Sequence, residues 1–181
     1  MSELPEGWAL ASLTDVCELN PGKPKSDALK ANTQVTFVPM AAVDADSGII
    51  KSPSVREYAS VSKGFTSFQE HDVIMAKITP CMENGKAAIA RNLVSGFGFG
   101  STEFHVFRAN DATLPEYIFY FIRQEAFRRV AEVNMTGSVG QKRVPGDFLR
   151  EVDVPLPPLN EQRRIIAKLE ELINRPLAKV R

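Results

Sequence analysis

The sequence predicts a mixed α+β domain of the α/β class. Packed helices should cover a twisted sheet, and an amphipathic helix should protrude at the C-terminal end. Short apolar runs between turn residues, such as residues 35–42 and 73–76, are typical of buried strands. Apolar residues at helical spacing in residues 113–133 predict a helix packed on the sheet. A second helical pattern, at residues 160–173, follows three prolines and predicts a helix outside the globular body.

Length and charge bound the possible functions. The chain has 181 residues, of which 44% are apolar, enough for one hydrophobic core and too few for two. Its formal net charge is zero, whereas a free-standing DNA-binding domain is usually clearly basic. A DNA-binding face is still compatible with this balance, because the charge need only be favourable locally.

The cysteine usage and the hydropathy indicate in which cellular compartment the protein acts. Cys17 and Cys81 lie far apart and form no CxxC pair, so we interpret both as free thiols of a reducing compartment. No stretch approaches the roughly 20 apolar residues of a membrane span, and residues 1–8 lack the basic-then-apolar pattern of a secretion signal. We therefore expect a cytoplasmic protein with no membrane partner.

The N-terminal third combines a strand with turn-rich loops. Trp8 is expected as a core anchor, and the alternation in residues 8–13 predicts a strand. A short helix is expected at residues 14–19. Residues 20–25 contain prolines, a glycine and lysines, which predicts a basic loop. The turn at residues 44–48 resembles a calcium loop superficially, but the glycine and the glutamate that such a loop needs are missing.

Further strands occupy the middle of the chain. Residues 65–78 carry two strand patterns, and residues 87–90 and 104–107 predict two more. The glycine-rich run at residues 96–100 mimics a dinucleotide-binding loop. A strand rather than a helix follows it, which excludes that fold. His105 alternates with phenylalanines and has no second histidine nearby, which favours a sheet residue over a metal ligand.

Residues 113–133 carry the best helical pattern in the chain. Thr113 and Glu116 have capping-box spacing, with Pro115 inside the first turn. The buried face is expected to contain Ile118, Phe121, Ile122, Phe127 and Val130. The charged residues of this segment should form a solvated surface: Arg123, Arg128, Arg129 and Glu132. For the three arginines, contact with phosphate is the alternative.

The glycine-rich basic segment at residues 135–150 is the best candidate for nucleic-acid contact. Its glycines let the backbone approach a groove, and its polar side chains supply donors for phosphates and base edges. The alternative is an ordinary mobile loop, and the residues alone leave both open. The candidate contacts in this segment are Ser138, Gln141, Lys142 and Arg143.

The C-terminal segment begins with a rigid connector, whose prolines keep the chain extended: Pro155, Pro157 and Pro158. Asn160 is expected as the N-cap of the helix that follows, and Glu161 suits its positive end. The apolar stripe of this helix steps by four and three, which is coiled-coil spacing, at Ile165, Leu169 and Leu172. A helix that folds back onto its own domain and a helix that mediates assembly both explain this stripe.

Several blocks resemble the specificity (S) subunits of type I restriction-modification enzymes. PLPPLNEQRRIIAKLEEL, at residues 155–172, is similar to the block that opens the conserved helical spacer after each target recognition domain of that family. LPEGW, at residues 4–8, resembles the entry into that domain. The blocks at residues 63–88, 100–108 and 137–145 also resemble family blocks and occur in the same order.

The resemblance implies a DNA target recognition domain at residues 1–154, followed at residues 155–181 by the connector and the start of the spacer helix. Such a domain is non-catalytic, needs no cofactor or metal, and reads one half of a split target in double-stranded DNA. Its partners would be methyltransferase (M) subunits and, in the full complex, restriction (R) subunits. Typical S subunits carry two such domains, so one domain implies a half-subunit or a fragment. A half-subunit would form a homodimer through the spacer helix and read a split palindrome.

Loop chemistry places the expected DNA contacts. A good bidentate contact to a base contributes about 1–3 kcal/mol of discrimination, so a few contacts select a half-site. The polar loop at residues 77–86 has a lysine at each end and joins the glycine-rich segment as a candidate. The full set is Gln141, Lys142, Arg143, Ser138, Lys77, Thr79, Asn84, Lys86, Ser101, Thr102 and Glu103.

Two alternatives are a stand-alone enzyme and a methyltransferase-associated assembly protein. A methyltransferase needs an Asn/Asp-Pro-Pro-aromatic motif, and the sequence at Asn20 lacks the second proline and the aromatic residue. A metal-dependent nuclease needs clustered carboxylates with a lysine, and the sequence contains no convincing set. A pure assembly protein would leave the polar loops of the body unexplained.

Overall fold

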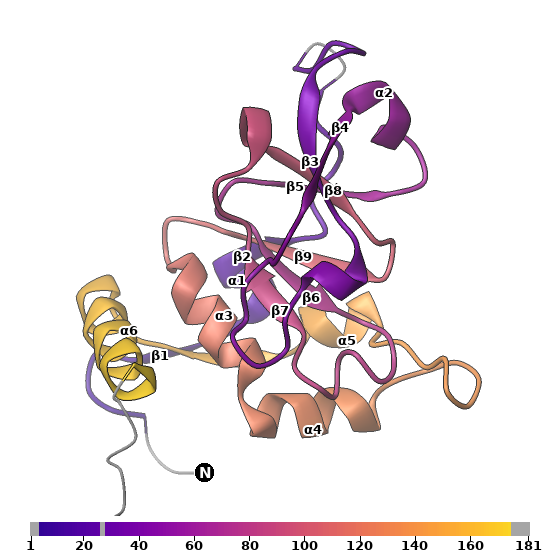
Figure 1. Cartoon of the computed structure of the whole chain (residues 1–181). Coiled ribbons are helices and arrows are strands. Elements are labelled where there is room, and N and C mark those ends of the chain that lie inside the picture. The colour runs from indigo at the N-terminus through magenta and orange to yellow at the C-terminus, as the bar shows by residue number, and fades with distance from the viewer. Residues whose placement is uncertain (1–3, 26–27, 175–181) are drawn as a thin grey trace, which may run out of the picture.

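The structure, a computed structural model, describes residues 4–25 and 28–174 (Figure 1). The last part of the predicted connector-and-helix segment, residues 175–181, lies outside the described residues. In chain order the elements are β1 (Ala9–Ser12), α1 (Leu13–Val16), β2 (Cys17–Leu19), β3 (Gln34–Val38), η1 (Met40–Ala42), β4 (Ser54–Glu57), α2 (Tyr58–Val61), β5 (Thr66–Gln69), β6 (Val73–Ala76), β7 (Ala87–Ile89), η2 (Val94–Gly96), β8 (Phe97–Gly100), β9 (Phe104–Ala109), α3 (Pro115–Arg123), α4 (Glu125–Val133), α5 (Gly146–Arg150), β10 (Asp153–Leu156) and α6 (Leu159–Ile173).

The strands form two four-stranded sheets, in the orders β2-β9-β6-β7 and β4-β3-β8-β5, and a two-stranded sheet of β1 and β10. The pair β3 and β8 is parallel, and the other strand pairs are antiparallel. The predicted mixed α+β class is confirmed, with two packed sheets in place of the single sheet expected. The predicted strands at residues 73–76, 87–90 and 104–107 appear as β6, β7 and β9.

The sheet β2-β9-β6-β7 is buried on both faces. Val73 and Met75 of β6 pack into the core that this sheet shares with the helices. Ile74 points the other way, into a second core with Val38 of β3 and Phe68 of β5, so the expectation of a single core was wrong. Because successive side chains of a strand alternate between faces, a strand covered on both sides must be apolar throughout. This double cover explains the unbroken apolar run in β6.

The glycines of β8 allow two layers to approach closely. A Cβ atom at Gly98 would lie 2.0 Å from the ring of Phe68, and one at Gly100 would lie 2.4 Å from the carbonyl oxygen of Val38. The glycine-rich run that mimics a nucleotide-binding loop is therefore a strand whose neighbours occupy the side-chain space.

The predicted helix at residues 113–133 is two helices. The chain breaks at Gln124, whose ψ of 138° lies outside the helical region, so α3 ends at Arg123 and α4 begins at Glu125. The predicted capping box is wrong, because the N-cap residue is Leu114 rather than Thr113. Val130 is 56% exposed, so its place on the buried face was also wrong. Ile118, Ile122 and Phe127 are buried as predicted, and Phe121 packs against them partly buried.

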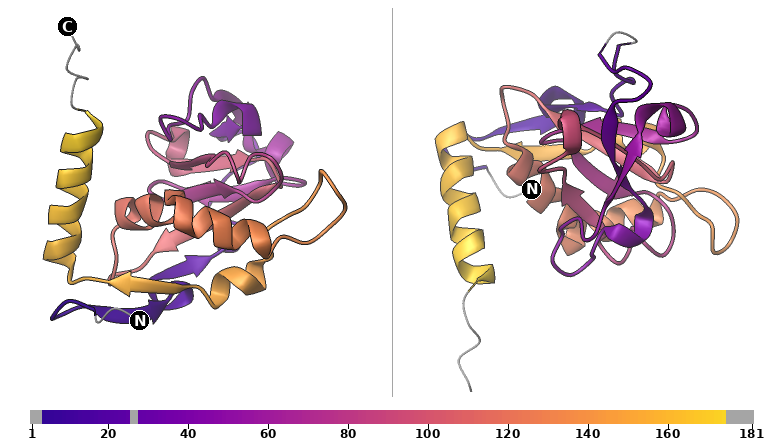
Figure 2. Two further views of the ribbon diagram at one scale, coloured as in Figure 1. Left: turned by 90° about the horizontal axis from the view of Figure 1, so that it is seen from below. Right: turned by 45° about the horizontal axis from the view of Figure 1, so that its top comes forward.

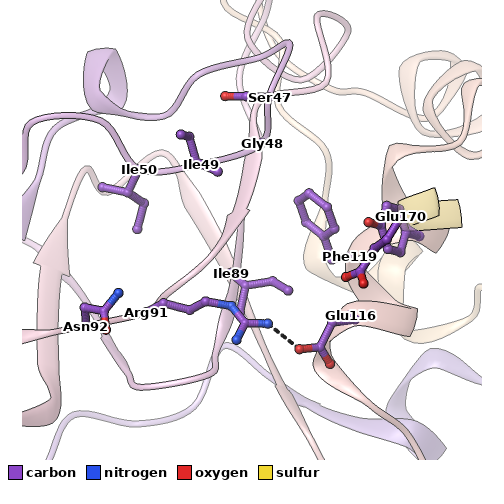
Figure 3. Close-up of a pocket in the computed structure, with 11 residues that line it drawn as sticks. Ser47, Gly48, Ile49, Ile50, Ile89, Arg91, Asn92, Glu116, Phe119 and Glu170 are labelled. Atoms are coloured by element: carbon purple, nitrogen blue, oxygen red, sulfur yellow. Dashed lines mark hydrogen bonds and ion pairs between the residues drawn. The ribbon is translucent and has the colours of Figure 1, made fainter. Parts of the chain in front are cut away.

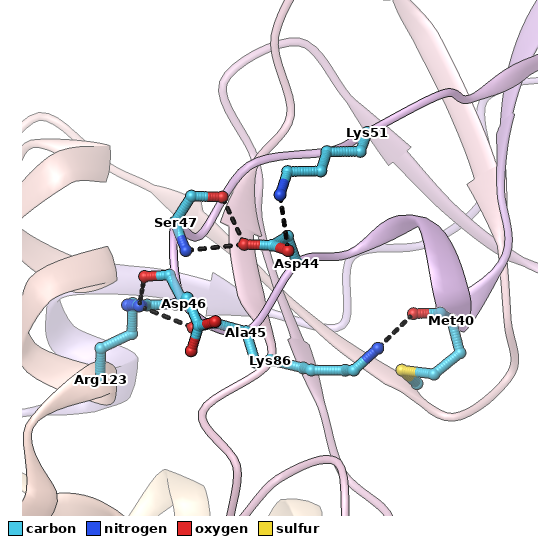
Figure 4. Close-up of polar contacts among 8 residues, drawn as sticks. All are labelled: Met40, Asp44, Ala45, Asp46, Ser47, Lys51, Lys86 and Arg123. Atoms are coloured by element: carbon cyan, nitrogen blue, oxygen red, sulfur yellow. Dashed lines mark hydrogen bonds and ion pairs between the residues drawn. The ribbon is translucent and has the colours of Figure 1, made fainter.

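Two arginines of these helices hold loops rather than facing solvent. Arg123 donates from Nη2 to the carbonyl oxygens of Ala45 and Asp46, each at 2.9 Å (Figure 4). Arg128 donates from Nη1 to the carbonyl oxygen of Glu83. The expected solvated surface is thus wrong for Arg123 and Arg128, because both guanidinium groups donate to backbone carbonyl oxygens of neighbouring loops. Arg129 is exposed, as expected.

The N-terminal elements differ in detail from the prediction. The expected strand at residues 8–13 is β1 (Ala9–Ser12), which pairs with β10 (Asp153–Leu156), far away in sequence. The expected helix at residues 14–19 is shorter and earlier: α1 is followed at once by β2. Trp8 is only partly buried, so its role as a core anchor was wrong.

The C-terminal helix α6 begins earlier than predicted. Its N-cap residue is Pro158, so Asn160 lies inside the first turn and the predicted N-cap was wrong. Figure 2 shows α6 beside the body at the end of β10, with its C-terminal end extending away from that strand. Gln162 and Ile166 are buried against the body, whereas Leu172 and Ile173 are exposed.

Candidate nucleic-acid interface

Three segments that are distant in sequence meet beyond the ends of β6 and β8. The backbone N–H of Lys77 donates to the carbonyl of Glu103 at 2.9 Å, and the N–H of Val144 donates to the carbonyl of Lys77 at 2.8 Å. The N–H of Thr79 donates to the carbonyl of Lys142 at 3.0 Å. We call these segments the loop cluster; it comprises residues 77–79, 101–103 and 141–144.

An ion pair fastens two of the segments together. Arg143 donates from Nη2 to Oε1 of Glu103 at 2.7 Å and from Nε to Oε2 at 2.9 Å. The Arg143 guanidinium lowers the pKa of the Glu103 carboxyl by its hydrogen bonds, and Glu103 raises the pKa of Arg143 in turn. Arg143 also donates from Nη1 to the carbonyl of Gln141 at 2.8 Å. This bidentate pairing orients the guanidinium, which retains further N–H groups beyond these contacts.

The glycine-rich segment projects from the body as a loop closed at its base. Thr136 and Arg143 exchange two backbone hydrogen bonds, at 2.8 and 2.9 Å. Gly137 and Gly140 have φ values of +119° and +78°, a region that other residues rarely adopt. Figure 1 shows the loop extending beyond α4 and α5. Its predicted contact residues Ser138, Gln141 and Lys142 are all exposed.

A buried histidine of β9 forms a hydrogen bond with the backbone of the loop cluster. His105 donates from Nε2 to the carbonyl of Val144 at 2.8 Å, which requires the proton on Nε2. Its Nδ1 accepts from Nδ2 of Asn20 at 3.0 Å, and Oδ1 of Asn20 accepts from the N–H of Val106 at 3.0 Å. Burial lowers the pKa of His105, so the ring is neutral. His105 is a residue of β9, as the sequence predicts.

A depression beside the loop cluster adds residues that the prediction of contacts omitted. It has a volume of about 310 Å³, and its lining includes Asn20, Lys23, Thr66 and Lys77. Lys23 donates from Nζ to the carbonyl of Ser62 at 2.6 Å. The basic composition of residues 20–25 was visible in the sequence, but nothing in the sequence pattern placed that loop beside Lys77.

The remaining candidates divide into two groups. Ser101 accepts the N–H of Glu103 at its Oγ at 3.2 Å, and Thr102 is exposed between them, so both belong to the loop cluster. Lys86 instead donates from Nζ to the carbonyl of Met40 at 3.2 Å (Figure 4), where it holds η1. Asn84 is exposed in the same turn. The structure therefore does not bring Lys86 into the loop cluster.

A second depression lies between α3, α6 and the turn before Ile50, with a volume of about 370 Å³ (Figure 3). Within it Arg91 and Glu116 form an ion pair, and Phe119 lies beside Gly48 and Ile49. The pairing offsets the two charges, and Oγ of Ser47 donates to Oδ1 of Asp44 at 2.6 Å. The polar side chains that line this depression include two carboxylates: Ser47, Arg91, Asn92, Glu116, Tyr120 and Glu170.

The stripe of α6 is divided between the body and solvent. Ile165 and Leu169 are half-buried and line an apolar groove of about 210 Å³ together with Trp8 and Tyr117. Leu172 is 49% exposed. Both expectations for this helix are thus partly met: its first half lies on its own domain and its second half leaves an apolar edge exposed.

Within residues 4–25 and 28–174, no three side chains of the His, Cys, Asp and Glu types are grouped to hold a metal ion. In the same described part of the chain, no helix is long and apolar enough to cross a bilayer. Burial raises the pKa of the Cys17 thiol to about 12, which keeps it protonated and unreactive.

Comparison with known proteins decides the family. A family model described as the type I restriction modification DNA specificity domain matches residues 5–179. The chain belongs to this family. The matched residues include both four-stranded sheets, the loop cluster and α6.

Curated relatives and solved structures agree with this assignment. The type I restriction enzyme EcoAI specificity subunit of Escherichia coli is 39% identical over 173 residues, and the EcoEI specificity subunit of the same organism is 37% identical over 172 residues. The crystal structure of the HsdS subunit from Thermoanaerobacter tengcongensis superposes with a TM-score of 0.77 at 28% identity over 96% of this chain.

The specificity domain described here corresponds to part of each of these proteins. The matches cover 95% and 94% of this chain but only 29% and 28% of the EcoAI and EcoEI subunits. The match to the T. tengcongensis subunit covers 44% of that chain. The chain thus spans less than half the length of these relatives.

Proposed function

We propose that this chain is a DNA target recognition domain that reads one half of a split target and directs methyltransferase and restriction subunits to it. The observation that carries the proposal is the family match over residues 5–179. In this assignment residues 1–154 form the reading domain and residues 155–181 the connector and the start of the spacer helix. The chain itself performs no chemistry, binds no cofactor and acts in the cytoplasm.

The loop cluster is the part of the surface best suited to DNA. Lys142 and Gln141 extend from a projecting loop, and Lys77 lies beneath it at the edge of the depression that Lys23 also lines. Cationic and amide side chains of this kind serve for phosphate and base-edge contact respectively. Glu103 pairs with Arg143 and offsets part of the positive charge of this surface.

Assembly is the proposed role of α6. The exposed Leu172 and Ile173 continue the stripe of Ile165 and Leu169 beyond the body. A second spacer helix, from another copy of the chain or from a second half of a longer subunit, would cover this edge.

The experiment that tests the function is a map of methylated adenines in cells that carry the cognate methyltransferase subunit, with and without this protein. A new split motif that depends on the protein supports the proposal. A palindromic motif indicates two copies of this domain, and an asymmetric motif indicates a second, different recognition domain. If no motif depends on the protein although it binds the purified methyltransferase subunit, the proposal is wrong.

A further inference from the structure

A fully buried glutamine joins α6 to the recognition domain. Gln162 has no exposed surface, although it lies on the first turns of a helix that is otherwise largely exposed. Burying an amide side chain without partners is unfavourable, so such a residue is kept only where its hydrogen bonds are made.

All the hydrogen-bonding capacity of this amide is used. Nε2 donates to the carbonyl oxygens of Ala112 and Pro157, each at 2.9 Å. Oε1 accepts from the N–H of Leu114 at 2.9 Å and from Oγ1 of Thr113 at 3.2 Å. One side chain thus ties α6 both to the connector before it and to the segment that leads into α3.

The other contacts of α6 with the body are less directional. Ile166 is buried, and Ile165 and Leu169 border a groove of about 210 Å³ rather than a filled core. Apolar contact has no preferred angle, whereas a hydrogen bond weakens steeply once its geometry is bent. A second polar tie, from the Tyr117 hydroxyl to the carbonyl of Pro155, fixes the connector but does not touch the helix.

A small tilt of α6 relative to the recognition domain is enough to change the separation of two half-sites. A helix of 15 residues is about 22 Å long and one base pair rises about 3.4 Å, so a tilt of about 9° at the anchor moves the far end of α6 by one base pair. A spacer that holds two half-sites at one separation must therefore be anchored more tightly than this.

We propose that Gln162 sets the direction of α6 relative to the recognition domain and thereby the number of base pairs between the two half-sites. Gln162 is a positioning residue, since it acts through the helix and contacts no DNA. The inference rests on the proposed function, because a gap exists only if the chain reads half of a split target.

The test replaces Gln162 by methionine, which keeps the length of the side chain and removes its four hydrogen bonds. The specificity subunit that contains this chain is expressed with its methyltransferase subunit, and methylated adenines are mapped. We expect unchanged half-site sequences and at least a tenfold rise in the share of methylated sites whose gap is one base pair longer or shorter. The substitution Thr113→Val removes one of the four bonds and should have the same effect at smaller amplitude.

The control separates positioning from stability. Val35→Ala destabilises the core around α2, away from the connector, and should lower methylation at all sites without changing the gap. If Gln162→Met behaves like this control, the inference is overturned while the proposed function stands. If Gln162→Met does not accumulate, an unchanged gap in Thr113→Val overturns it. If the unaltered subunit yields no split motif, both the proposed function and this inference are wrong.

Discussion

His105 donates from Nε2 to the carbonyl oxygen of Val144 at 2.8 Å, so a buried strand residue holds the segment that follows Lys142 and Arg143. The contact joins the sheet to the loop cluster through a buried ring whose Nδ1 lies 3.0 Å from Nδ2 of Asn20. The backbone beside the proposed DNA-contact residues is thus held by a titratable group whose pKa is lowered by burial.

This relationship predicts that stability falls with acidification. Burial lowers the pKa of His105, so below about pH 6.5, the ordinary pKa of histidine, the unfolded chain takes up a proton that the folded chain resists. The free energy of unfolding should therefore decrease as pH falls from about 6.5, and His105 should contribute nothing to this trend above that range. Urea unfolding of the wild type and His105→Gln between pH 7.5 and 5 measures it. The variant should show the shallower slope. Equal slopes for the wild type and His105→Gln would contradict the assignment of the pH dependence to His105.

Lys142 and Arg143 should differ in what they contribute. Lys142 is exposed, so Lys142→Ala should weaken DNA binding by the assembled complex and reduce the slope of log affinity against log salt by about 0.9, without changing stability. Arg143→Ala should also destabilise the loop cluster and raise the pKa of Glu103 toward its usual range. Binding titrations across a salt series, with urea unfolding in parallel, distinguish the two.

Lys51→Ala provides a cationic control for these substitutions, because Lys51 pairs with Asp44 in a turn beside Arg123 rather than in the loop cluster. It should leave the salt slope unchanged. A Lys142→Ala complex with the affinity and salt slope of the wild type would remove the projecting loop from the proposed contacts.

The close approach of β8 to β3 predicts a steric effect. Gly100→Ala should lower the free energy of unfolding by about 1–3 kcal/mol, because the new methyl group would lie 2.4 Å from the carbonyl oxygen of Val38. Gly22→Ala is the matched control, since no atom of residues 4–25 and 28–174 other than its chain neighbours lies within 4 Å of a Cβ at this position. Thermal unfolding of both variants checks the prediction, and equal midpoints would contradict it.

The exposed end of α6 predicts a defect in assembly alone. Leu172→Glu should disrupt association with the partner helix while the domain keeps its stability, because Leu172 is 49% exposed. The double change of Ile165 and Leu169 to aspartate should also disrupt assembly, with some loss of stability since both line the groove beside Trp8. Size-exclusion chromatography and capture of the methyltransferase subunit measure assembly. Normal assembly of both variants would rule out α6 as the contact.

Local patterns predicted the elements that depend on local causes. The apolar run of β6 indicated a strand covered on both faces, and the periodicity of α6 and its preceding prolines indicated a helix after an extended connector. The predictions from sequence were wrong where a side chain forms a hydrogen bond with a residue far away in the chain instead of with a neighbouring residue. Thr113 has the spacing of a helix cap, but its hydroxyl donates to Gln162 instead.

The sequence by itself determined the fold class, the order of most elements and the family, because strand and helix periodicity and the family blocks are properties of contiguous residues. Only the tertiary structure decided that residues 77–79, 101–103 and 141–144 form one surface and that Gln162 closes the joint with α6. The physical reason is that these hydrogen bonds join residues far apart in the chain, and their formation depends on how the two sheets and α3 pack rather than on any local pattern.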